Sequence, residues 1–255
     1  MAPPGVTGVD GIVMTVSFNG IGFLGFDVFG TIVDWRSSVA RAAGPFLERY
    51  GIDVDALAFA DEWRSLYQPS MQRIRSGDRP WVRLDVLNRE NLETVLAHHG
   101  ADRGTIPDDD LVRLNTSWER LDPWPDSVEG LTLLRTRFAI GALSNGHLAG
   151  MMKLARFGHL PWDIIVGAEI ARSYKPTPQT YLKSVDAAGF RPDQAAMVAA
   201  HNSDLQAARA AGLRTVFIRR PNEHGSEQTT DLEPEADWDV VAENLIDAAR
   251  KLGCA

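Results

Sequence analysis

The stretch Gly25-Phe-Asp-Val-Phe-Gly-Thr31 decides the fold of this chain, and it closes an apolar run that begins at Ile21. It places a carboxylate, Asp27, where a buried strand turns into a loop. Two positions later stands Phe29, whose ring can neither donate nor accept a proton. An aspartate at such a strand end can attack an electrophilic carbon and form an ester, which divides a difficult displacement into two easier steps. The alternative interpretation of Asp27 is an ordinary loop aspartate that caps a turn or pairs with a lysine.

Short apolar runs alternate with helical patterns over most of the remaining chain. The predicted strands are Ile21–Phe26, Phe138–Leu143, Asp163–Val166, Ala195–Ala199 and Thr215–Ile218. They lack polar alternation, which is typical of a parallel sheet buried on both faces. The helices predicted between them are His147–Phe157, Pro178–Ala188 and Asp204–Ala211. This alternation predicts a doubly wound α/β fold, which binds its ligands at the carboxyl ends of the strands.

The segment from Ser37 to Trp118 breaks this alternation. It contains only amphipathic helical patterns, over Val39–Tyr50, Ala56–Ile74, Trp81–His99 and Asp109–Trp118. We therefore expect a helical cap over residues 37–118, able to act as a lid. It would be inserted into an α/β core formed by residues 21–36 and 119–255. Residues 1–20 are rich in Gly and Pro and are expected to form a loose arm, or an extra strand through Ile12–Phe18.

Composition argues against several classes of function. The chain has 255 residues, with 26 basic and 34 acidic side chains and a formal net charge of −8. An acidic surface repels phosphate backbones, so we expect no nucleic-acid partner. No window approaches the roughly eighteen apolar residues of a membrane span, so we expect no membrane partner. The single cysteine, Cys254, allows no intrachain disulfide, and no signal-peptide pattern is present, so we expect a cytoplasmic protein.

Four separate segments place polar residues at the ends of predicted strands. They are Asp27–Thr31, Ser144-Asn145, Lys175 in Ser-Tyr-Lys-Pro, and Ala199–Asp204. The ends of parallel strands share one edge of a sheet, so these residues are expected to converge. A lysine near a carboxylate lowers its pKa and keeps it ionised. A helix start after Ser144 would form an anion cradle, although a plain helix cap explains this serine equally well.

These motifs, in this order, resemble the haloacid dehalogenase superfamily, and in particular the type II L-2-haloacid dehalogenases. The resemblance extends from Ile21 to Leu252. The first loop of the superfamily usually reads Asp-x-Asp-x-Thr, and its second Asp protonates the leaving group of a phosphate ester. Phe29 stands in that place and favours a leaving group that departs as a stable anion, as halide does. The resemblance implies a hydrolase acting on carbon-halide bonds of short 2-haloalkanoic acids, without metal or organic cofactor.

The resemblance also implies roles for individual residues in the first chemical step. Asp27 is expected to attack the carbon that bears the halogen, and Thr31 to hold the Asp27 carboxylate. Arg64, within Glu62-Trp-Arg-Ser65, and Asn145 are expected to receive the halide, because a guanidinium is always charged and has several fixed donors. Phe29 is expected to line the substrate site. Arg64 would otherwise be interpreted as a solvated helix residue.

Further roles concern the substrate carboxylate and the hydrolytic water. Ser144, Lys175 and loop amides are expected to hold the substrate carboxylate, and Tyr181 matches a tyrosine of the family pattern. Asp204 is expected to guide the water that cleaves the ester and to pair with Lys175. Familiar members carry an Asn where this chain has His201, which could shape the halide pocket, act as a base near neutral pH, or fill space. This departure leaves both the halide preference and the details of ester hydrolysis open, and an additional donor such as His201 could allow fluoroacetate as a substrate.

Two rival functions and one assembly state remain open at this level. A Mg²⁺-dependent phosphohydrolase would use Asp27 and Asp204 to hold the ion, but the lack of a general acid at Phe29 would cost about 10²–10⁴ in rate. A non-catalytic binding scaffold is the second rival. Relatives often pair through their helical regions, which makes a homodimer an option. His98 and His99 have no metal-ligand partners at the usual spacing, so no metal site is expected there.

Overall fold

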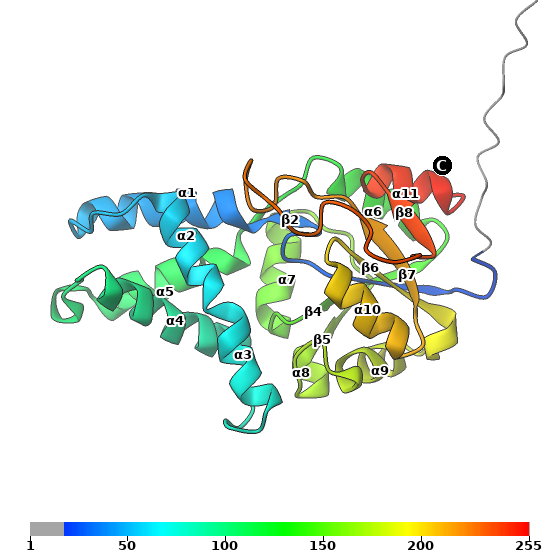
Figure 1. Ribbon diagram of the computed structural model, residues 1–255, viewed down its shortest axis with the longest axis horizontal. Coiled ribbons are helices and arrows are strands. Elements are labelled where there is room, and N and C mark those ends of the chain that lie inside the picture. Colours follow the sequence, from blue (N-terminus) through cyan, green and yellow to red (C-terminus); the bar gives the residue numbers. More distant parts are fainter. Residues whose placement is uncertain (1–17, 255) are drawn as a thin grey trace, which may run out of the picture.

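The computed structural model describes residues 18–254. Most of the arm predicted for residues 1–20, with its alternative strand through Ile12–Phe18, lies outside the described residues. The described chain consists of a parallel sheet covered by helices and a helical region that extends from one end of the sheet (Figure 1). Among the described residues, no helix has both the length and the apolar character needed to cross a membrane.

The sheet confirms the predicted α/β fold. Its six strands are all parallel and follow the order β5-β4-β1-β6-β7-β8. The strands are β1 (Phe23–Phe26), β4 (Ala139–Ser144), β5 (Ile164–Gly167), β6 (Ala195–Ala199), β7 (Arg214–Ile218) and β8 (Val240–Ala242). In the middle, β1 pairs with β4 and β6, so Phe26 is in register with Ala142 and Val198. The loop after β1 therefore starts at the centre of the sheet's carboxyl edge.

Helices bury the sheet on both faces, as expected for strands without polar alternation. On one face α6 (Ser127–Arg135), α7 (Leu148–Phe157) and α11 (Leu245–Lys251) share a core with Phe26. On the other face α9 (Pro178–Ala187) and α10 (Asn202–Ala210) share a core with Phe23 and Leu143. Two short elements, α8 (Ala168–Ala171) and η3 (Pro192–Gln194), complete the connections.

The helical region is inserted between β2 (Val33–Asp34) and β3 (Asp122–Pro123), which pair antiparallel. Its elements are α1 (Trp35–Arg49), α2 (Ala56–Ser65), α3 (Tyr67–Arg75), α4 (Leu84–His98), η1 (Arg103–Thr105), α5 (Asp108–Asn115) and η2 (Thr116–Glu119). The first helix begins where Asp34 Oδ1 accepts the Ser37 N–H at 3.0 Å, an ordinary N-cap. The insertion carries no strand of the six-stranded sheet, as the sequence pattern predicted.

The single helix predicted over Ala56–Ile74 is wrong, because the chain forms two helices that meet at Leu66. Pro69 is the physical cause: it has no N–H for an intrahelical bond, and its ring clashes with the carbonyl four residues earlier, at Ser65. Arg64, at the end of α2, lies beside Tyr67, at the start of α3.

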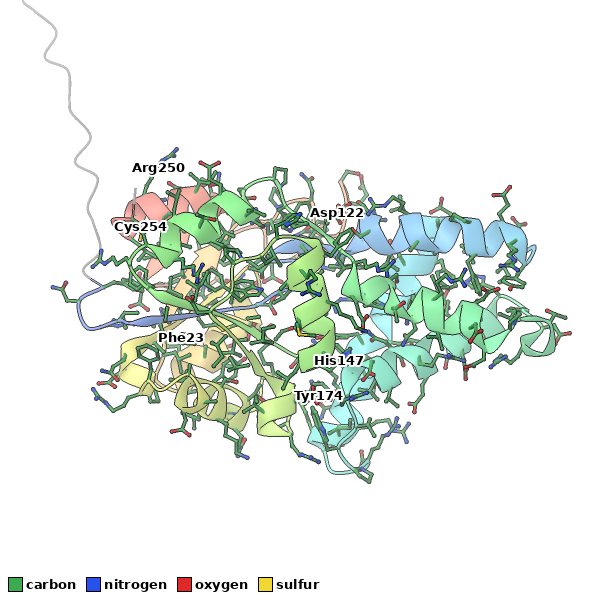
Figure 2. All side chains as sticks on the ribbon, turned by 180° about the vertical axis from the view of Figure 1, so that it is seen from behind. Phe23, Asp122, His147, Tyr174, Arg250 and Cys254 are labelled. Atoms are coloured by element: carbon green, nitrogen blue, oxygen red, sulfur yellow. The ribbon has the colours of Figure 1, made fainter. Side chains whose placement is uncertain are left out.

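The helical region contacts the core next to one of the expected site residues. Tyr174 donates from its hydroxyl to the Val82 carbonyl at 2.8 Å, and its ring packs against Trp81 with centroids 4.7 Å apart. Figure 2 shows Tyr174 at this boundary, seen from behind. Arg75 of α3 donates to the Lys175 carbonyl at 3.0 Å. These contacts hold the helical region over the carboxyl edge of the sheet.

Candidate active site

A cavity of about 560 Å³ lies where the carboxyl edge of the sheet meets the helical region. Seven of the ten residues singled out from the sequence line it: Asp27, Phe29, Arg64, Asn145, Lys175, His201 and Asp204. Three do not line it and are fully buried instead: Thr31, Ser144 and Tyr181. Residues far apart in sequence therefore converge as expected from parallel strand ends.

Asp27 follows β1 and is held by three side chains. Thr31 Oγ1 donates to Asp27 Oδ2 at 2.8 Å, and Lys175 Nζ donates to Asp27 Oδ1 at 2.8 Å. His201 Nδ1 lies 3.1 Å from Asp27 Oδ2. Burial alone would raise the pKa of Asp27, but the charge of Lys175 and the contact with His201 outweigh it and hold this pKa well below its usual range. Asp27 is therefore an ionised carboxylate at the cavity wall, as nucleophilic attack requires.

Thr31 joins two of the strand-end loops. Besides donating to Asp27, its hydroxyl accepts the Ala200 N–H at 2.9 Å. Ala200 lies in the loop after β6, the strand that pairs with β1. One hydroxyl thus fixes the Asp27 carboxylate relative to the loop that carries His201.

Lys175 bridges two buried carboxylates. Its ammonium donates to Asp204 Oδ2 at 2.5 Å as well as to Asp27, and Tyr181 donates to Asp204 Oδ1 at 2.5 Å. Burial would lower the pKa of Lys175, but the two carboxylates raise it above its ordinary value. Burial and the charge of Asp27 raise the pKa of Asp204, against the effect of Lys175. Lys175 is a permanent cation in the site, and both Asp204 oxygens already accept a hydrogen bond.

Asn145 and Ser144 follow β4 and differ in what they offer to the cavity. Asn145 Oδ1 accepts a hydrogen bond from the backbone N–H of Lys175 at 2.8 Å. The Nδ2 of Asn145 is therefore the donor that can face a ligand in the cavity. Ser144 Oγ accepts the Gly146 N–H at 3.0 Å. The serine therefore shapes its own turn from behind the cavity wall, which matches its interpretation as a local cap rather than a direct ligand.

Arg64 lies in a box of aromatic rings. Its guanidinium carbon is 3.9 Å from the ring centre of Tyr67, 5.3 Å from that of Trp35 and 5.8 Å from that of Phe29. Its Nη1 is buried and has no hydrogen-bond partner among the described residues. A buried donor on a permanent cation is costly when no acceptor satisfies it. The arrangement fits a small anion in the cavity beside Arg64.

Sequence reasoning missed Glu223, which lies in the long connection between β7 and β8. Its carboxylate is buried, accepts from Trp35 Nε1 at 3.0 Å and lies 2.9 Å from His201 Nε2. Burial would raise the pKa of Glu223, but the charge of His201 outweighs it and lowers this pKa. Burial would lower the pKa of His201, yet Glu223 and Asp27 together raise it well above its ordinary value. No spacing motif signals Glu223, because it stands in a polar turn-like stretch, Pro221-Asn-Glu-His-Gly225.

His98 and His99 share a partner, Glu62, that their sequence spacing does not reveal. Glu62 Oε1 lies 2.6 Å from His98 Nδ1, and Glu62 Oε2 lies 2.8 Å from His99 Nε2. Their possible ligand atoms lie within 4.8 Å of one another. Glu62 is on α2 and the histidines end α4, so packing of the two helices, not sequence spacing, brings them together. The three groups satisfy one another outside the cavity.

Comparison with known proteins identifies the family. Residues 24–212 match the family model described as haloacid dehalogenase-like hydrolase. The chain belongs to this family. The resemblance drawn from its strand-end motifs is thereby confirmed, together with the fold that it implied.

Two solved structures are similar over nearly the whole chain. The defluorinating L-2-haloacid dehalogenase Rha0230 is 46% identical, with a TM-score of 0.89 over 91% of this chain and 95% of its own. The L-2-haloacid dehalogenase PA0810 is 42% identical, with a TM-score of 0.84 over 91% of this chain and 99% of its own. The fructose-1-phosphate phosphatase YqaB of Escherichia coli strain K12 is 28% identical over 76% of this chain and 94% of its own. The family thus includes relatives with different reactions.

Proposed function

We propose that this protein hydrolyses short 2-haloalkanoic acids to 2-hydroxy acids through an ester on Asp27. The observation that carries the proposal is Arg64, whose buried Nη1 has no acceptor among the described residues in a cavity shared with the ionised Asp27. An anion leaving a carbon attacked by Asp27 can be stabilised there without a proton. The similarity to two L-2-haloacid dehalogenases supports the same reaction.

In the first step, an Asp27 oxygen attacks the carbon that bears the halogen. A carbon–oxygen bond forms, the carbon–halogen bond breaks, and the halide leaves with the bonding electron pair. Attack from behind inverts the configuration of a chiral substrate. Arg64 and the Nδ2 of Asn145 receive the halide, while Lys175 and loop amides hold the substrate carboxylate. Ser144 acts through the shape of its turn, because its hydroxyl faces Gly146 N–H.

In the second step, water attacks Cγ of the Asp27 ester. The ester carbon–oxygen bond at Cγ breaks, the 2-hydroxy acid leaves, and the carboxylate of Asp27 is regenerated. The net reaction releases one halide and one proton in each turnover. Asp204 and His201 are the two side chains near Asp27 that can take a proton from the attacking water.

The proposed substrates include fluoroacetate. Its carbon–fluorine bond requires stronger stabilisation of the departing anion than a carbon–chlorine bond does. The Arg64 guanidinium in its aromatic box and the similarity to a defluorinating relative support this extension. We expect the protein to release fluoride from fluoroacetate more slowly than it releases chloride from chloroacetate. The rate of fluoride release should still be well above the rate of the Asp27→Asn variant.

A Mg²⁺-dependent phosphohydrolase is the rival, favoured by the similarity to YqaB. The donor set fits the ion poorly. Asp27 Oδ1 and Asp204 Oδ2 both accept from Lys175, Asp27 Oδ2 accepts from Thr31, and Asp204 Oδ1 accepts from Tyr181. The ammonium of Lys175 already lies between the two carboxylates that would have to hold the ion, and its positive charge disfavours a divalent cation beside it. Phe29 also stands where a phosphatase needs its general acid.

The test is a halide-release assay in the presence of a chelator. Chloroacetate, bromoacetate, fluoroacetate and both 2-chloropropionate enantiomers are incubated with wild type and with Asp27→Asn. We expect halide release by wild type without added metal and none by Asp27→Asn. Absence of halide release from every compound, together with Mg²⁺-dependent cleavage of an aryl phosphate, would overturn the proposal in favour of the rival. A non-catalytic scaffold would neither release halide nor cleave the aryl phosphate.

The homodimer stays a prediction, which sedimentation of the wild type tests separately.

A further inference from the structure

We propose that Glu223 is a positioning residue that makes His201 the general base for hydrolysis of the Asp27 ester. The inference rests on the proposed function and assigns the proton transfer of its second step. Glu223 lines the same cavity, but its carboxylate is hydrogen-bonded to His201 and Trp35 and not to Asp27, so it acts on the ester through the imidazole.

The imidazole of His201 lies between two carboxylates. One ring nitrogen, Nε2, lies 2.9 Å from Glu223 Oε2, and the other, Nδ1, lies 3.1 Å from Asp27 Oδ2. The Nε2 atom can stay protonated and donate its hydrogen bond to Glu223 in every state of the reaction. This fixes the tautomer and leaves Nδ1 as the nitrogen that gains or loses a proton beside Cγ of Asp27.

The Glu223 carboxylate is buried and fixed in place by hydrogen bonds and by the anchoring of its own segment. Its side chain is 1% exposed, and Trp35 Nε1 donates to its Oε1 at 3.0 Å. Three residues earlier, Arg220 donates to the Thr31 carbonyl at 2.9 Å and forms two 2.8 Å bonds to Asp126. The segment that carries Glu223 is therefore fastened to the Asp27–Thr31 loop.

Two geometric facts favour His201 over the other assignments. Asp204 is held by Lys175 and Tyr181, each at 2.5 Å, and no hydrogen bond joins it to Asp27 among the described residues. His201 contacts the Asp27 carboxylate itself, whereas a displaced halide leaves on the side of the carbon opposite Asp27. Hydrolysis at Cγ, and not halide binding, is the step that His201 can serve.

Formation of the ester changes the charge around His201. In the free enzyme the ionised Asp27 and Glu223 favour the imidazolium. Alkylation makes Asp27 neutral, which lowers the pKa of His201 and releases its Nδ1 proton to solvent. Neutral Nδ1 then takes a proton from water as the oxygen attacks Cγ, and returns it to the departing alkoxide of the product. Loss of the Asp27 carboxyl proton to Nδ1 restores the starting state, so one proton is released per turnover.

Charged groups from every neighbouring element bear on this titration. They are Asp27 after β1, Lys175 before α9, Asp204 on α10, Arg64 on α2, and Glu223, His224 and Asp231 in the β7–β8 connection. Of these, Asp27 and Glu223 contact the His201 ring directly. Asp27 loses its charge when the ester forms, whereas Glu223 keeps its own. Of the two groups in contact with the ring, Glu223 is therefore the one that raises the pKa of His201 throughout the reaction.

The test separates the two chemical steps in Glu223→Gln. Rapid mixing with chloroacetate measures the first turnover of halide release, and steady-state assays measure hydrolysis. We expect a burst of one halide per active site at the wild-type rate, followed by turnover slowed about 10²-fold or more. The protein should then accumulate the mass of one carboxymethyl group on the peptide containing Asp27. Glu227→Gln, an exposed glutamate of the same connection, is the matched control and should behave as wild type.

A pH profile distinguishes positioning from a merely structural role. Steady-state hydrolysis should rise with pH as His201 loses its proton, and loss of the Glu223 charge should shift this rise to lower pH while reducing the plateau. Glu223→Asp keeps the negative charge and should therefore keep the wild-type midpoint of the pH profile. This variant replaces Glu223→Gln in the test if the Gln variant does not fold. A slowed burst with unchanged hydrolysis, or a profile that does not move, would overturn the inference. Absence of any halide release by wild type would instead reject the proposed function.

Discussion

The carboxylate of Glu223 occupies the space above Gly30. A Cβ built on Gly30 would lie 2.0 Å from Glu223 Oε1, and the glycine has a φ of +86°. A glycine is thus needed just before Thr31, in the loop that decides the fold, for two reasons. Its backbone conformation disfavours side chains, and its missing side chain lets a distant carboxylate approach the loop.

Gly30→Ala should therefore reduce both stability and hydrolysis of the ester. The positive φ costs about 1 kcal/mol, and displacement of Glu223 adds to this loss in the free energy of unfolding. Denaturant unfolding and the burst assay measure the two effects. Gly51→Ala is the control, because Gly51 has a φ of +62° but no atom within 4 Å of the position that a Cβ would take. Equal effects of the two substitutions would show that Glu223 does not depend on this space.

Lys175→Met should move the acid limb of the pH profile for halide release to higher pH. Lys175 holds the pKa of Asp27 well below its usual range, so its removal raises that pKa and protonates the nucleophile at a higher pH. The first-turnover rate, measured against pH, gives the shift directly. Lys183→Met, an exposed lysine on α9, should leave the profile unchanged. An unshifted acid limb in Lys175→Met would contradict the assigned role of Lys175.

Arg64→Lys should slow halide release about 10²-fold, because an ammonium lacks the several fixed donors of a guanidinium. Inhibition by added chloride should weaken in the same variant, since the anion loses its donor in the aromatic box. Arg73→Lys, at an exposed site on α3, provides the control. A wild-type chloride inhibition constant in Arg64→Lys would place the halide elsewhere in the cavity.

Sequence patterns predicted the sheet and several of the polar residues that line the cavity, because these residues lie directly after strongly apolar runs. Asp27, Asn145 and His201 each follow a central strand, so the shared carboxyl edge was enough to bring them together. Strand β8 was missed because three residues give no usable periodicity. Glu223 was missed because a buried carboxylate in a loop is defined by its tertiary partners, His201 and Trp35.

Asp126→Asn should destabilise the protein and flatten its pH dependence at low pH. Burial would raise the pKa of Asp126, but Arg220 outweighs it and lowers this pKa. The pair therefore contributes stability above the unfolded-state pKa of about 3.9, and this contribution is lost as pH falls through the lower folded-state pKa. Breaking such a buried pair costs about 3–5 kcal/mol. Urea unfolding between pH 7 and pH 3 tests this, with Asp53→Asn, an exposed position, as control. A wild-type slope in Asp126→Asn would contradict it.

The most direct test of the central claim is a single turnover with excess enzyme in water labelled with ¹⁸O. Attack of water on Cγ of an Asp27 ester leaves the label in the Asp27 carboxylate, and the product hydroxyl carries the unlabelled oxygen that Asp27 supplied. We predict label in the peptide that contains Asp27 after one turnover of chloroacetate. Label found only in the product, with none in that peptide, would mean that water attacks the substrate directly and would contradict the account.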